Sequence, residues 1–152
     1  MPINASLVAF AHFIAVFGIV GTLVFEWLTF SAKPTLQEAR RLAMADRWYG
    51  ISAGVLLAAG FARAVYFEKG WAYYQHNPVF HAKIGLFLAM GLLSILPTVR
   101  FIRWGKELKA GQAPVVTPAQ FQSVRLTLRL QMVLLAVVAL CASLMAHGIG
   151  AR

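Results

Sequence analysis

Four long apolar stretches constrain this chain more than any other feature of its sequence. They lie at about residues 5–30, 48–67, 78–104 and 119–150 of a chain of 152 residues. A helix of about 20 apolar residues crosses the hydrocarbon core of a bilayer, and its backbone bonds to itself where no water is present. Charged residues make up only 12% of the chain, against about 25% in soluble domains. We therefore expect one all-α domain over residues 1–152, with the lipid bilayer as its solvent.

Local signals mark where three of the helices begin. Thr35 and Glu38 have the spacing of a capping box, which predicts a short amphipathic helix before the second span. Asn77-Pro78 and Thr117-Pro118 each combine a capping residue with proline at the first helical position. Because the connections are short, the simplest topology is an integral membrane up-down-up-down four-helix bundle.

Glycines in the spans predict close helix contacts. Small residues let helix backbones approach each other in lipid, and Gly50 and Gly54 form a GxxxG pattern. We expect these glycines to pack helices inside the bundle, and the same faces suggest a homo-oligomer. The set comprises Gly18, Gly21, Gly50, Gly54, Gly60, Gly85 and Gly91.

Basic residues gather in two of the connections. Under the positive-inside rule these connections are cytoplasmic, which predicts a multi-pass protein of the bacterial inner membrane with both termini periplasmic. No basic residue precedes Lys33, so we interpret the first apolar stretch as a retained span and not a signal peptide. The chain has a net charge of +9, but its basic residues lie between apolar stretches, which argues against a nucleic-acid partner. The basic residues are Lys33, Arg40, Arg41, Arg47, Arg100, Arg103, Lys106, Lys109 and Arg125.

The histidines lie toward the opposite end of the spans. Ionisable side chains at membrane depth usually mark function, and neutral imidazole is a common ligand of haem iron. His12 is the leading candidate axial ligand, paired either with His81 or with His147. Arg63 and Lys83 fall at the same level and could bind haem propionates, as could Lys69 in the loop, where we interpret His76 as an ordinary loop residue.

Glu26 lies near the basic end of the first span and has two interpretations. It is either an interfacial carboxylate paired with a loop arginine, which we favour, or a functional group, namely a proton-relay carboxylate or a partner of Arg125 or Arg129. Two further functional classes stay open for the whole chain. One is a non-enzymatic transporter or metal-handling protein with His76, His81 and His147 at its entry site, and the other is an assembly subunit of a membrane complex.

The chain resembles a bacterial family of small four-span membrane proteins of unknown function. The resemblance is carried by Arg40-Arg41-Leu42, Asp46, Tyr49-Gly50, Glu68-Lys69-Gly70, Tyr74, His76-Asn77-Pro78 and Pro97-Thr98-Val99-Arg100. More distantly, it is similar to HemJ-type protoporphyrinogen oxidases, which have a histidine in the first span and a later span that opens with His-x-Lys-Leu. His12 and the segment from His81 to Ile84 correspond to these features. The resemblance implies haem b binding and porphyrinogen oxidation.

From the residues and the resemblance together we expect a haem b-binding membrane protein with a redox role. That role is either membrane electron transfer or oxidation of a quinol or porphyrin-type substrate. The sequence leaves open whether the protein is an enzyme.

Overall fold

Four long helices form the protein, as the sequence predicts. The computed structural model describes residues 3–67 and 70–149. The long helices are α1 (Ile3–Thr29), α2 (Leu36–Ala62), α4 (Pro78–Arg103) and α6 (Pro118–Ala146). Each is about 40 Å long at 1.5 Å per residue, and each is apolar and long enough to cross a membrane. The all-α four-helix bundle is therefore confirmed.

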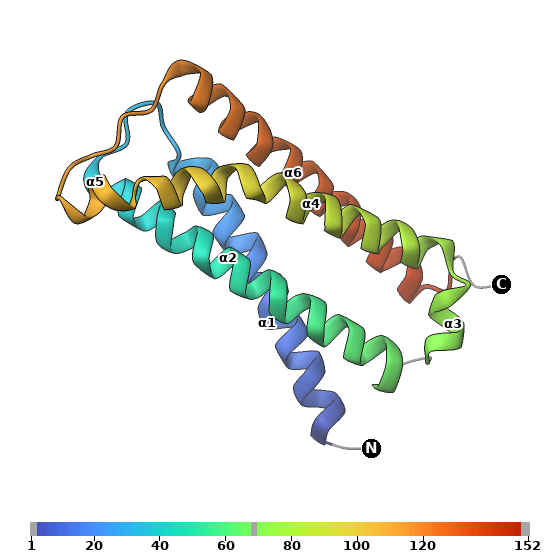
Figure 1. Ribbon diagram of the computed structural model, residues 1–152. Coiled ribbons are helices and arrows are strands. Elements are labelled where there is room, and N and C mark those ends of the chain that lie inside the picture. The colour runs from blue at the N-terminus through green and yellow to red at the C-terminus, as the bar shows by residue number, and fades with distance from the viewer. Residues whose placement is uncertain (1–2, 68–69, 150–152) are drawn as a thin grey trace.

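The bundle consists of two antiparallel hairpins, α1 with α2 and α4 with α6 (Figure 1). A π-helical turn, η1 (Arg63–Phe67), continues α2, and the short helices α3 (Trp71–Gln75) and α5 (Gly105–Lys109) lie in the connections. We call the end with the 30–35 and 110–117 connections the basic end. The opposite end, where α1 begins, α6 ends and α3 lies, we call the histidine end.

The predicted helix starts are confirmed. The Thr35 hydroxyl accepts from Glu38 N at 3.2 Å, and Glu38 Oε2 accepts from Thr35 N at 2.8 Å. Thr117 forms the same capping box with Gln120, and the Asn77 side chain caps α4. The prediction of a separate amphipathic helix before the second span was wrong. No proline interrupts residues 36–62, so the amphipathic segment and the span are one continuous helix.

The hairpins pack tightly at the basic end and diverge toward the histidine end (Figure 1). Phe30 is buried at the basic end, where it stacks on Trp104 and on Phe121 at centroid distances of 6.4 and 5.7 Å. A smaller apolar cluster closes the histidine end and ties α3 to its neighbours through Tyr74 and Phe80. The divergence makes room between the hairpins in the half of the bundle that holds His12.

Glycines pack the helices at only two of the predicted positions. A Cβ atom on Gly18 would lie 3.0 Å from Ser52 Cβ, so α1 and α2 need a glycine there. A Cβ on Gly60 would lie 3.4 Å from His12 Cε1. The expectation was wrong for the other span glycines, which have no neighbouring atom within 4 Å of a Cβ because they face away from the bundle interior. These are Gly21, Gly50, Gly54, Gly85 and Gly91.

Candidate functional site

Two adjoining cavities lie between the hairpins in the histidine half. The inner cavity has a volume of about 310 Å³, and the outer cavity, nearer the histidine end, has a volume of about 450 Å³. His12, Phe80 and Lys83 line both, so the two form one continuous space. These volumes fall within the range of about 300–1,000 Å³ that is typical of small-molecule and cofactor sites.

Each long helix contributes one apolar stripe to the inner cavity. The lining positions recur every three or four residues, which is the spacing of one helix face. The spacing of these residues is visible in the sequence, but the space between them is not, because the other faces of the spans are apolar as well. The stripe residues are Val16 and Ile19 on α1, Leu56 and Leu57 on α2, Ile84 and Phe87 on α4, and Leu135, Val138, Ala139 and Ala142 on α6.

His12 is the histidine that lines the cavities. It lies nine residues after the start of α1, about 14 Å along the helix, and is half-buried. Its imidazole stands against Gly60 of α2, where a Cβ would be 3.5 Å from His12 Nδ1. A methyl group at position 60 would touch the ring at ordinary van der Waals distance, so Gly60 lies directly against His12.

Arg63 and Lys83 bring two positive charges to the outer cavity. The Arg63 guanidinium lies over the Phe13 ring, with Cζ 5.5 Å from the centroid, and Lys83 Nζ lies 5.7 Å from the Phe80 centroid. Tyr74 lines the same cavity. The inner cavity is therefore apolar and the outer cavity electropositive. Lys69, also predicted to bind propionates, lies outside the described residues.

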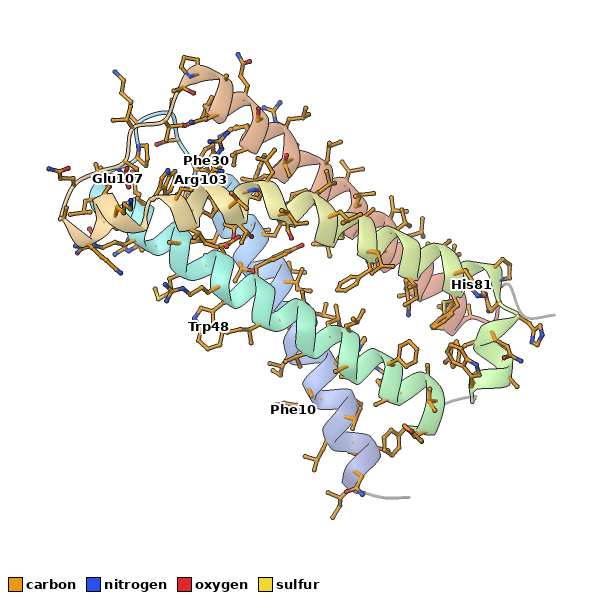
Figure 2. All side chains as sticks on the ribbon, in the orientation of Figure 1. Phe10, Phe30, Trp48, His81, Arg103 and Glu107 are labelled. Atoms are coloured by element: carbon orange, nitrogen blue, oxygen red, sulfur yellow. The ribbon has the colours of Figure 1, made fainter. Side chains whose placement is uncertain are left out.

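The other three histidines do not line either cavity. His81 is exposed on α4 (Figure 2), and its Nδ1 lies 2.9 Å from the Asn77 carbonyl oxygen. His147 and His76 are also exposed, and each makes the same kind of contact with a carbonyl one turn earlier. The structure thus brings His12, Arg63 and Lys83 together but not His12 with His81 or His147. The role of His81 as an iron ligand stays a prediction.

Sequence reasoning missed the apolar and aromatic lining of the outer cavity, which includes Met145 and Tyr74. Met145 is buried near the end of α6, and Tyr74 is buried on α3. Met145 continues the α6 stripe by one helical turn, so its position could have been predicted from spacing. Tyr74 could not, because α3 is a short loop helix without a periodic pattern.

Glu26 does not form the predicted ion pair with an arginine. Arg125 Nη1 donates to the Phe30 carbonyl oxygen at 3.3 Å, and its guanidinium lies over the Phe121 ring. Arg129 is exposed. Among residues 3–67 and 70–149, Glu26 Oε1 has no hydrogen-bond partner. The favoured interpretation of Glu26 was therefore wrong.

The described part of the chain shows no group of three or more His, Cys, Asp or Glu side chains placed to hold a metal ion.

Comparison with known proteins places the chain in a family. The family of predicted membrane proteins named DUF2214 matches residues 4–150, which is almost the whole chain. The chain belongs to this family. The four spans of this DUF2214 protein agree with the family description, and the resemblance to a family of membrane proteins is confirmed. Neither the curated proteins nor the solved structures contain a match to it.

Proposed function

We propose that this DUF2214 protein binds b-type haem in the inner and outer cavities and has a redox role in the membrane. One observation carries the proposal: His12 lines an apolar cavity that becomes electropositive toward the histidine end. Haem has matching parts, namely iron that binds imidazole, an apolar macrocycle, and propionates that bind cations.

The residues present fit this cofactor. His12 would hold the iron, the stripe residues would cover the macrocycle, and Arg63 with Lys83 would bind the propionates. Met145 is a second lining side chain of a kind that binds haem iron. When bound, the haem supplies one-electron chemistry, and the protein sets its potential through axial ligation and burial.

The cavity position supports a lipid-soluble reaction partner. Leu57 and Ala139 line the inner cavity and are also exposed on their helices, so the cavity opens on a side of the bundle. In a membrane that side faces lipid, from which a quinol or a porphyrin-type substrate could enter. The proposed reaction is electron transfer with a membrane quinol or oxidation of such a substrate.

The location of the basic residues supports an orientation in the bacterial inner membrane. The positive-inside rule favours a cytoplasmic basic end. The basic residues at this end include Lys33, Arg40 and Arg47 near one connection and Lys106 and Lys109 near the other. The cavities would then lie in the periplasmic half, with both termini on that side.

A second candidate role rests on the outward glycines. Gly50 and Gly54 are exposed on α2 and have open space around them, which leaves a face on which another helix could pack closely. This favours a homo-oligomer or an assembly subunit. Gly54→Leu should then lower the particle mass in detergent, and an unchanged mass would argue against this face.

The haem proposal is tested by titrating the detergent-purified protein with haem and recording absorption. We expect His12→Ala to weaken haem binding at least about tenfold, because it removes the lining imidazole. His76→Ala serves as the matched control, since His76 is an exposed loop histidine that lines neither cavity. Equal affinity of the His12→Ala variant and the wild type would overturn the proposal.

Two variants in the same assay test which residue, besides His12, would bind the haem iron. Met145→Leu should convert low-spin haem to high-spin if Met145 is the second ligand. His81→Ala should do so if α4 turns His81 into the cavity when haem binds. If neither variant changes the spin state, His12 is the single ligand among these residues.

A further inference from the structure

A second buried polar group lies in the basic half of the bundle, and the proposed function does not use it. Its buried side chains are Glu26 of α1, Asp46 and Tyr49 of α2, and Gln131 of α6. The half-buried Thr98 of α4 joins them by bonding Asp46. Glu26 is 2% exposed and Asp46 is 7% exposed. Polar groups buried in a membrane span are costly and usually functional.

Hydrogen bonds satisfy most of this group. Tyr49 Oη donates to Gln131 Oε1 at 2.8 Å, and Thr98 Oγ1 donates to Asp46 Oδ1 at 2.7 Å. Glu26 differs, because its Oε1 is buried without a hydrogen-bond partner in the described part of the chain. The Glu26 carboxyl group nevertheless lies close enough to Asp46 and Tyr49 to interact electrostatically with both.

No positive charge in the described part of the chain compensates the two carboxyl groups. The titratable groups that face Glu26 are Asp46 and Tyr49 of α2. On the other packed helices, Arg125 of α6 is directed to the Phe30 carbonyl, and α4 contributes the neutral Thr98. Within residues 3–67 and 70–149, neither carboxyl forms an ion pair. Two buried carboxylates without a cation are strongly unfavourable, so the pair needs a bound positive charge.

We propose that Glu26 and Asp46 form a proton-binding site in which one exchangeable proton is held on Glu26 beside Asp46. A carboxylate takes up one proton and becomes a carboxylic acid, and no other bond changes. The buried Glu26 Oε1, which lacks a donor, gains an O–H group that can donate to its neighbours. A metal ion fits less well, because the described residues provide no third acidic, histidine or cysteine ligand here.

The proton exchanges with the aqueous phase at the basic end. Glu26 lies three residues before the end of α1, about 5 Å along the helix, whereas His12 lies fourteen residues earlier. The two sites are therefore at opposite ends of the bundle. The proton site does not depend on haem, so its test and the haem titration can fail separately.

Infrared spectroscopy of the purified protein in sodium-free buffer tests this site directly. We expect the C=O stretching band of a buried protonated carboxyl group, and we expect it to disappear as the pH is raised. Glu26→Gln should remove the band, whereas Glu107→Gln, which changes an exposed carboxyl on α5, should leave it unchanged. Absence of the band in the wild type at every pH, or its persistence in Glu26→Gln, would overturn the proposal.

Two further variants and the addition of sodium distinguish a shared proton from a bound metal cation. Asp46→Asn should keep the band but shift its frequency, because the group beside the protonated Glu26 changes from a carboxyl to an amide. An unshifted band would contradict a site shared by Glu26 and Asp46. If added sodium removes the band at constant pH, the site binds a metal cation and the proposal is wrong. Glu26→Asp retains a carboxyl group, so a shifted band in this variant serves as the second test should Glu26→Gln fail to fold.

Discussion

At the scale of single residues, charge and aromatic packing act together in the outer cavity. Arg63 and Lys83 come from different hairpins. Arg63 lies over the Phe13 ring, and Lys83 lies over the Phe80 ring. Cation–π contacts stabilise a positive charge beside an apolar surface. An amphipathic anion with an apolar body is the ligand that this arrangement favours.

Neutralising either cation should weaken haem binding. We expect Arg63→Gln and Lys83→Met each to lower haem affinity about tenfold, the usual loss for one hydrogen bond to a charged group. The loss should diminish at high salt. Haem titration followed by absorption provides the measurement. Arg47 is an exposed arginine at the basic end, so Arg47→Gln should bind haem as the wild type does. If Arg63→Gln and Lys83→Met also bind haem with wild-type affinity, these two cations do not bind the propionates.

The residues of the cavity were only partly predictable from the sequence. His12, Arg63 and Lys83 stood out because ionisable side chains are rare in apolar spans. His81 stood out for the same reason but lies on another face of α4, since Phe80, Lys83, Ile84 and Phe87 follow the cavity-facing spacing. Helical phase therefore separates the lining residues from His81, and residue type alone does not.

At the scale of elements, one close contact sets how α1 meets α2. Gly18 of α1 faces Ser52 of α2, and a methyl group at position 18 would press on the serine Cβ and hydroxyl. This contact lies in the middle of the hairpin whose far end carries His12 and Gly60. A shift of α1 on α2 would therefore alter the wall of the cavity.

Gly18→Ala should destabilise the hairpin by about 1–3 kcal/mol, the usual cost of overpacking. The matched control is Gly21→Ala on the same helix, where a Cβ meets nothing within 4 Å. Thermal unfolding in mild detergent, followed by circular dichroism, measures the difference, and Ser52→Gly should restore stability to the Gly18→Ala protein. Equal unfolding temperatures for the two alanine variants would show that the contact does not set the helix spacing.

The starts of the helices were predictable from the sequence, whereas which glycines face a neighbouring helix was not. The starts depend on local hydrogen bonds of Thr35, Asn77 and Thr117, which the sequence displays directly. The glycine contacts depend on which side of each helix meets a neighbour. Gly18 and Gly54 look alike in sequence, but only Gly18 meets another helix.

At the scale of the whole molecule, the hairpins meet at the basic end and separate at the other. The large aromatic residues Phe30, Phe101 and Trp104 are concentrated where the hairpins meet. Four apolar stretches and short connections were enough to predict the bundle. The divergence depends on side-chain packing between hairpins, so the sequence did not predict the cavity.

The orientation of the whole bundle is expected to follow the positive-inside rule. In a Cys141→Ala background, a cysteine at His76 should react with a membrane-impermeant thiol reagent in intact cells. A cysteine at Gln112, in the connection at the basic end, should react only after the membrane is permeabilised. The opposite labelling pattern would place the cavities in the cytoplasmic half.

The central claim is that the cavity around His12 holds haem. The most direct measurement is the absorption spectrum of the protein purified in mild detergent from cells supplied with haem. We predict a Soret band that elutes with the protein and that is lost or shifted to a high-spin form in the His12→Ala variant. A haem-supplemented protein that folds but shows no Soret band would contradict the claim.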